Sequence, residues 1–218
     1  MKKFLRDNSL SIVFFILFLL AMGGQVVFGL KEFNKSQHDE GAPTIGMAEY
    51  LTSGHFVQST FENWESEFLQ MALFVILTIF LQQRGSSESK DFTKEEAVDR
   101  EPSAIRKDVP WPVKAGGWKL AIYKHSFSIA LLFLFVVSFI FHFCGSLNDE
   151  NDQLAIKNLP PESAWEYAGN SRFWFESMQN WQSEFLSVFV IVIFSIWLRQ
   201  KGSSQSKPVD APHSHTGD

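Results

Sequence analysis

The sequence is short of the residues that usually build chemical sites. It has a single cysteine, Cys144, among 218 residues, which excludes an internal disulfide framework and a cysteine-rich zinc site. It contains no glycine-rich phosphate loop, no His-Glu-x-x-His metal motif and no Gly-x-Ser-x-Gly nucleophile motif. The net charge is −5, so there is no basic surplus of the kind that binds nucleic acid. We therefore expect no enzyme activity, no catalytic residue, no metal, no cofactor and no nucleic-acid partner.

Apolar residues, by contrast, gather in four runs, and charged residues gather between them. The runs are Leu10–Leu30, Phe68–Leu81, Phe127–Cys144 and Phe185–Leu198. A helix needs about 20 mostly apolar residues to cross the hydrocarbon core of a bilayer. The first and third runs nearly suffice by themselves. The second and fourth correspond to only about 21 Å of helix each, so their interpretation as spans needs support from elsewhere in the chain.

That support comes from an internal repeat. When the chain is shifted by 117 residues, Asn63–Leu69 (Asn-Trp-Glu-Ser-Glu-Phe-Leu) falls on Asn180–Leu186 (Asn-Trp-Gln-Ser-Glu-Phe-Leu). Over residues 63–90, 16 of the 28 positions are identical, which predicts a tandem duplication of one helical hairpin. The apolar run near the N-terminus has a partner in the middle of the chain, so we expect it to be a retained helix and not a cleaved signal peptide.

The repeat and the apolar runs together predict the architecture. We expect an all-α integral membrane protein with four transmembrane helices, arranged as two tandem helical-hairpin repeats with parallel pseudo-twofold symmetry. The first repeat covers residues 1–90, with spans at about 9–30 and 60–83.

The second half follows the same plan after a connection. Residues 91–117 are expected to form a cytoplasmic linker with an interfacial segment rich in Trp and Lys. The second repeat covers residues 118–207, with spans at about 125–145 and 177–200, and residues 208–218 form a polar cytoplasmic tail.

The positive charges indicate the orientation. Of the 19 Lys and Arg residues, 15 lie in the N-terminal tail, the central stretch or the C-terminal tail, and four lie in the two other loops. Positive residues mark the cytoplasmic side of a membrane protein. We therefore predict a multi-pass protein of the bacterial inner (plasma) membrane with cytoplasmic N- and C-termini. Its expected partners are the lipid bilayer and either a second copy or another membrane protein.

Polar residues enter the membrane if the two short spans extend upstream. Asn63, Ser66 and Glu67 then share one helix face by their i, i+3, i+4 spacing. Helix rise puts residues of the other spans at a similar depth. The predicted polar layer comprises Gln25, Asn63, Ser66, Glu67, His142, Asn180, Ser183 and Glu184.

Two interpretations of the polar layer remain open. Hydrogen bonds among such groups hold transmembrane helices together, and carboxylates are favoured in the first turns of a helix. We favour this structural interpretation. Alternatively, intramembrane ionisable residues mark an ion or proton path, with His142 and Glu184 as a titratable pair.

Tryptophans are placed where the ends of the spans are expected. Indole rings prefer the membrane–water interface. The expected interfacial anchors are Trp64, Trp174 and Trp181 on the outer side, and Trp111 and Trp118 on the inner side.

The stretch Gly54–Lys90 carries Asn-Trp-x-Ser-Glu-Phe-Leu and then Gln-x-Arg-Gly-Ser-Ser. It resembles a family of small bacterial membrane proteins of unknown function, and the resemblance covers most of the chain, including the duplicated hairpin. It implies a fold and a membrane location, and no substrate, cofactor or active residue. The first functional hypothesis is therefore a structural or interaction protein. The alternative is a small ion or proton channel or transporter that uses the polar layer.

Overall fold

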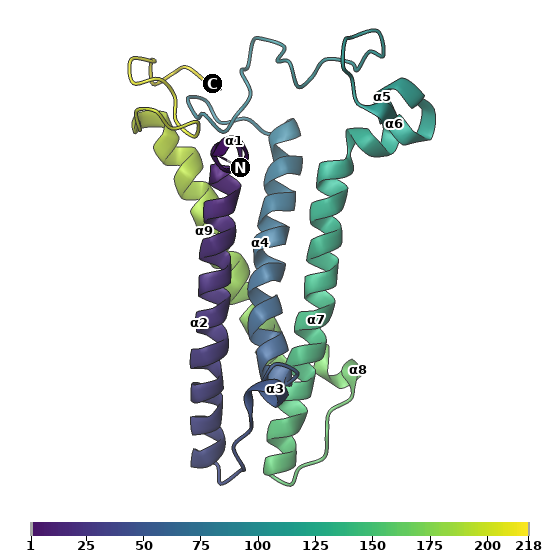
Figure 1. Ribbon diagram of the computed structural model, residues 1–218, viewed down its shortest axis with the longest axis vertical. Helices are drawn as coiled ribbons and strands as arrows, with labels where there is room; N and C mark the ends of the chain where they lie inside the picture. Colours follow the sequence, from purple (N-terminus) through teal and green to yellow (C-terminus); the bar gives the residue numbers. More distant parts are fainter. Residues whose placement is uncertain (1, 218) are drawn as a thin grey trace. The chain divides into compact units, whose positions relative to one another are not determined.

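Helices are the only regular secondary structure in the part of the chain that the structure, a computed structural model, describes (residues 2–217), and that range contains no strand. The long helices are α2 (Ser9–Asp39), α4 (Gly54–Phe80), α7 (Ser126–Ile156) and α9 (Ser171–Trp197) (Figure 1). The short helices are α1 (Lys2–Asp7), α3 (Met47–Tyr50), α5 (Trp111–Ala115), α6 (Gly117–Lys124) and α8 (Ala164–Tyr167). The prediction of an all-α protein is confirmed.

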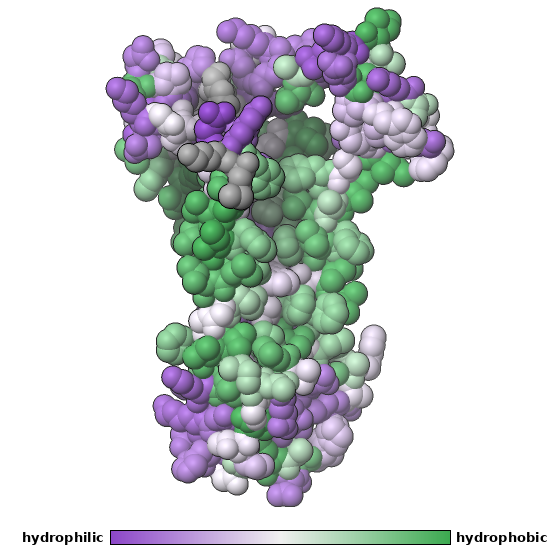
Figure 2. Space-filling model, viewed as in Figure 1, coloured by the Kyte–Doolittle hydropathy of each residue, from purple (hydrophilic) through white to green (hydrophobic). Residues whose placement is uncertain are grey.

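Within residues 2–217, three helices are long and apolar enough to cross a membrane, namely α2, α7 and α9. The expectation of four such helices is wrong by this measure, because α4 does not qualify. The first half of α4 carries Glu62, Glu65 and Glu67, which lower its mean hydropathy and leave only the short apolar run in its second half. In Figure 2, hydrophobic side chains gather over the long helices, and hydrophilic side chains gather over their ends and the connecting segments.

Helices α2 and α7 continue well past their apolar runs into polar sequence. No Gly or Pro interrupts the polar stretches that end at Asp39 and Ile156, and their residues are adequate helix formers. Shortly after each helix the backbone turns left-handed, at Gly41 with φ 75° and at Asn158 with φ 55°. Gly and Asn are the residues that accept this conformation at a helix end. The polar extensions supply the acidic residues of the candidate site.

The chain folds into two compact units. The first unit combines Met1–Phe61 with Ile140–Phe173, and the second combines Glu62–Phe139 with Trp174–Asp218. Helices α4, α7 and α9 contribute residues to both units.

Buried aromatic rings hold the loops of the first unit. Tyr50 and Tyr167, in the loops after α2 and α7, are fully buried. The phenol of Tyr50 lies directly against Gly29, where a Cβ atom would collide with its hydroxyl group. The hydroxyl group of Tyr167 is hydrogen-bonded to the hydroxyl group of Ser146 on α7. Each loop is therefore pinned back onto the helix that precedes it.

In the same unit, the start of α4 crosses α7 backbone against backbone. A Cβ atom on Gly54 would lie 2.7 Å from the carbonyl oxygen of Gly145 and 2.9 Å from the carbonyl carbon of Asn148. A Cβ atom on Gly145 would lie 2.9 Å from Val57 Cγ1. Real Cβ atoms need more room than this, so only glycine at both positions permits the crossing. The crossing brings Gln58 of α4 next to the polar extension of α7.

In the second unit, residues 208–217 pack against the turn that follows α4. The buried ammonium group of Lys207 donates hydrogen bonds to the carbonyl oxygens of Gly85 and of His215, the latter at 2.8 Å. The N–H group of Gly85 in turn donates to Thr216 Oγ1 at 2.9 Å. Burial lowers the pKa of Lys207, and the positive charge of Arg199 lowers it further. The C-terminal segment is thus part of the packed second unit.

Candidate functional site

Arg172 organises the polar end of the first unit. It lies in the first turn of α9, where its backbone N–H group donates to Asn170 Oδ1 at 2.9 Å. Its guanidinium group reaches Asp149 Oδ2 at 2.6 Å, Glu150 Oε2 at 2.7 Å and Gln58 Oε1 at 3.2 Å. Asp149 is only 3% exposed. A buried carboxylate is tolerable when it is paired with a positive charge and hydrogen-bonded, and the guanidinium group of Arg172 provides both the charge and the hydrogen bond.

A cavity of about 280 Å³ adjoins this ion network in the first unit. Four of its eleven lining side chains are acidic, one is an arginine and one is a histidine. The lining residues are Glu32, Phe33, Ser36, Gln37, Glu40, His55, Asp149, Asp152, Gln153, Ile156 and Arg172.

The acidic character of the cavity extends to its neighbours. Burial raises the pKa of Tyr50, and the carboxylate of Asp149 raises it further. The Tyr50 hydroxyl group lies 3.4 Å from His55 Nδ1, at hydrogen-bond distance. Such surroundings favour a cationic group in the cavity, and Arg172 already occupies that role for two of the carboxylates. Among residues 2–217, the cavity lining includes no cysteine or lysine nucleophile.

The second loop of this unit is held by a capping box at the start of α8. Ser163 Oγ accepts a hydrogen bond from the Glu166 N–H group, and Glu166 Oε2 accepts one from the Ser163 N–H group at 2.9 Å. Hydrogen bonds from the Ser163 hydroxyl and N–H groups lower the pKa of Glu166. The matching position of the first loop is Gly46, which offers no side-chain cap to α3. The second loop is therefore the better anchored one at its helix start.

Two predicted residues of the polar layer belong to the first unit. Gln25 on α2 donates from Nε2 to Thr60 Oγ1 at 3.1 Å and to Ser59 Oγ at 3.4 Å, so it connects α2 to α4. His142 on α7 is fully buried, with its ring centroid 5.0 Å from that of Phe173.

The other six predicted layer residues belong to the second unit. Ser66 and Ser183 each donate to the backbone carbonyl three residues earlier on their own helix, at 2.8 and 2.9 Å. Those carbonyls belong to Asn63 and Asn180, and Asn63 is exposed. Glu67 and Glu184 lie close enough for their carboxylates to interact. The two serines therefore hydrogen-bond within their own helices. The carboxylates of Glu67 on α4 and Glu184 on α9 interact from one helix to the other. The predicted pair of His142 with Glu184 stays a prediction.

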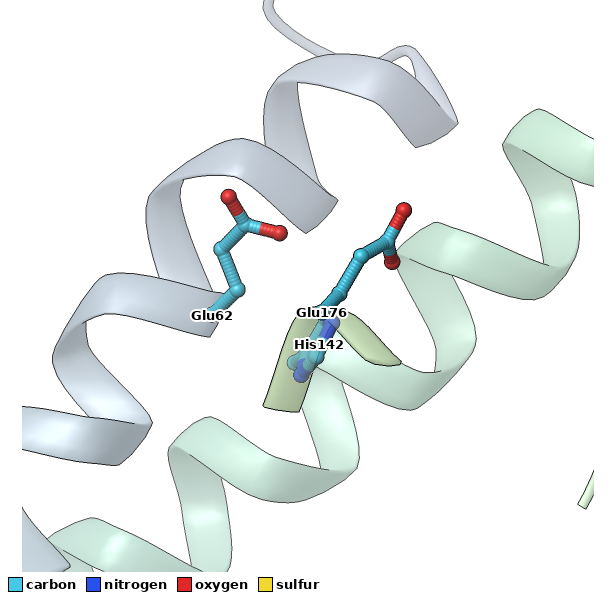
Figure 3. A group of neighbouring side chains, drawn as sticks. All are labelled: Glu62, His142 and Glu176. Carbon is cyan, nitrogen blue, oxygen red and sulfur yellow. The ribbon is translucent and has the colours of Figure 1, made fainter. Parts of the chain in front are cut away.

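Three carboxylates of the second unit lie outside the predicted polar layer. Glu65 is fully buried and accepts a hydrogen bond from Trp181 Nε1 at 2.8 Å. Glu62 on α4 and Glu176 on α9 have carboxylate oxygens within 4.8 Å of each other (Figure 3). The repeat does not predict Glu62 and Glu65 as layer residues, because the second repeat has Gln at the matching positions. The sequence holds no local signal for the contact between Glu65 and Trp181, because Trp181 is 116 positions away and its own neighbour is Gln182.

The expected interfacial anchors differ in their surroundings. Trp111, Trp118 and Trp174 are 64%, 71% and 40% exposed. Trp64 and Trp181 are half-buried, and Trp181 is the one with the hydrogen bond to Glu65.

The comparison with protein families decides the classification. The family described as "Domain of unknown function (DUF6766)" matches residues 1–218. The chain belongs to this family. No curated protein and no solved structure matches the chain. The DUF6766 match agrees with the resemblance noted in the sequence to a family of unknown function, and the apolar helices add that this member suits a membrane.

Proposed function

We propose that this chain is an interaction protein of the bacterial inner membrane that associates with a second copy of itself through α2. One observation carries the proposal: α2, a 31-residue helix with a strongly apolar sequence, has no buried residue. From α2, Gln25 donates side-chain hydrogen bonds to Thr60 and Ser59 of α4. A helix this apolar and this little covered by its own chain presents its surface to lipid and to neighbouring proteins.

The centre of α2 is suited to close approach. At Gly23 and Gly24, an added Cβ atom would meet nothing within 4 Å. Association of helices in a bilayer depends on packing and not on the hydrophobic effect, so small residues that let backbones approach are favoured at such contacts. The two glycines provide an open stretch of backbone in the middle of an otherwise bulky apolar helix.

The helix bounds support the proposal of two tandem hairpins. Helices α2, α3 and α4 begin at residues 9, 47 and 54, and α7, α8 and α9 begin at 126, 164 and 171, each 117 positions later. Asn34 exchanges two hydrogen bonds with the backbone of Ile45, and Asn151 makes the corresponding pair with Glu162. The same side chain thus closes the same loop in each half.

The distribution of Lys and Arg, 15 against four, supports cytoplasmic placement of both termini.

Disulfide crosslinking in native membranes tests the association. The exposed Cys144 is first replaced by serine. In that background, Leu20→Cys on α2 is expected to give crosslinked dimers upon mild oxidation, because α2 faces its copy. Leu20 is 67% exposed, and Phe189 on α9, 61% exposed, gives the matched control Phe189→Cys. Equal crosslinking of both variants, or none with Leu20→Cys, would count against the proposal.

A second candidate function, ion or proton conduction, is favoured by the carboxylates of α4 and α9. Glu65 is fully buried, and Glu62 and Glu176 lie close together in the second unit. Ionisable groups in membrane helices commonly mark ion paths. If the candidate holds, Glu67→Gln combined with Glu184→Gln abolishes proton or cation flux into liposomes, whereas Glu88→Gln with Glu95→Gln, in the non-helical segment between α4 and α5, leaves it intact. Absence of flux in the wild type excludes this function.

A further inference from the structure

Helices α5 and α6 carry a compact basic and aromatic surface, which consists of Trp111, Lys114, Trp118, Lys119 and Tyr123 (the α5–α6 surface). Trp111 and Trp118 are 64% and 71% exposed, and Tyr123 is 42% exposed. Tryptophan rarely lies this open to water, so these rings indicate a surface that something else covers.

A glycine turn produces this surface. Gly116 and Gly117 have φ angles of 66° and 55°, a conformation that residues other than glycine rarely adopt. This turn folds α6 back onto α5. The Lys119 ammonium group then lies 4.7 Å from the ring centroid of Trp111 and 5.8 Å from that of Trp118. Attraction between the cation and the indole faces keeps the charge at the level of the two rings.

The charge of this segment has one sign. Between Val109 and Ser126 the chain has three lysines and no Asp or Glu. Lys124 is paired with Glu101 at 2.9 Å. Lys114 and Lys119 have no acidic partner anywhere in the part of the chain that the structure describes, residues 2–217. Two positive charges therefore remain available to an anionic partner.

The position in the chain identifies that partner. Helix α6 ends at Lys124, and α7, which is apolar enough to cross a membrane, begins at Ser126. The α5–α6 surface therefore lies where the chain enters a membrane helix, at the depth where indole rings settle among lipid headgroups. We propose that the α5–α6 surface binds the headgroups of anionic phospholipids.

The test uses the full chain in detergent, titrated with phosphatidylglycerol or with phosphatidylcholine, and counts bound lipid by native mass spectrometry. The wild type is expected to prefer phosphatidylglycerol, with an affinity that falls as salt is added. Each lysine near an anionic surface increases the binding constant by a factor of about five. Lys114→Gln with Lys119→Gln should therefore weaken phosphatidylglycerol binding by ~30-fold.

Two matched pairs separate charge at this surface from charge in general. Lys114→Arg with Lys119→Arg should bind as the wild type does. Lys31→Gln with Lys35→Gln, on the polar extension of α2, removes the same charge and should also leave binding unchanged. The proposal is overturned if the wild type shows no preference for phosphatidylglycerol, or if both glutamine pairs lose binding equally. Tighter binding of an RNA or an acidic peptide than of phosphatidylglycerol would also overturn it. The wild-type preference and its salt dependence need no variant, so a folding defect does not obscure the result.

Discussion

Arg172→Met is expected to lower the free energy of unfolding by roughly 3 kcal/mol. Asp149 is only 3% exposed, and the Arg172 guanidinium group lies 2.6 Å from its Oδ2 atom. Without that group, the buried carboxylate loses this positive partner. Removing one partner of a buried ion pair is costly because it leaves an uncompensated charge. We take the lower end of the usual range because the Arg172 side chain is 29% exposed and water compensates part of the loss. Unfolding in mixed detergent micelles, followed by circular dichroism, measures the change.

Two further variants identify the cause of that loss. Lys157→Met removes a positive charge at an exposed position in the loop between α7 and α8 and should change the stability little. Asp149→Asn combined with Arg172→Met should recover part of the loss, because the amide carries no charge to leave unpaired. If Arg172→Met unfolds like Lys157→Met, the ion network does not stabilise the first unit.

Gly145→Ala is expected to destabilise the protein by roughly 1–3 kcal/mol. The added methyl group would lie 2.5 Å from the backbone nitrogen of Gln58 and 2.9 Å from Val57 Cγ1. Backbone cannot rotate away as a flexible side chain can, so α4 and α7 would have to separate at their crossing. The same separation would move Gln58 away from Arg172, which donates to it at 3.2 Å. Thermal unfolding and cysteine accessibility near Gly54 measure the two consequences.

Gly46→Ala is the matched control for the crossing. Gly46 lies in the same unit, has an ordinary extended conformation and has nothing within 4 Å of an added Cβ atom. It should keep the wild-type stability or gain slightly, because alanine restricts the unfolded chain more than glycine does. Equal melting temperatures for Gly145→Ala and Gly46→Ala would show that the crossing tolerates separation.

The proposed functions make different demands on the polar groups. In an interaction protein, all of these groups can be engaged in internal hydrogen bonds, as the side chains of Gln25 and Trp181 are. A conduction path needs ionisable groups that can exchange protons or ions. Glu67 is exposed, whereas Glu65 is fully buried, so the two groups test different parts of the conduction hypothesis. The crosslinking and flux measurements decide between the two functions independently.

The sequence by itself determined that the protein is helical, where its apolar helices lie and that the chain suits a membrane. Runs such as Phe127–Cys144 require a helix in lipid, because every backbone polar group must be satisfied within the segment. The length of helices α2 and α7 was underestimated, since hydropathy registers the lipid-facing part and not the polar extension beyond it. The prediction of a span at about 60–83 is wrong by the same measure, because in α4 the repeat argument outweighed three nearby glutamates.

Only the tertiary structure decided which polar residues meet. Arg172 lies 23 positions from Asp149 and 114 from Gln58 along the chain, and Glu65 lies 116 positions from Trp181. No local periodicity links residues so far apart, because their contact depends on how closely the helix backbones approach. At Gly54 and Gly145 that approach is set by the absence of two Cβ atoms. Both glycines can be read in the sequence, but that they lie against each other is known only from the packing of α4 against α7.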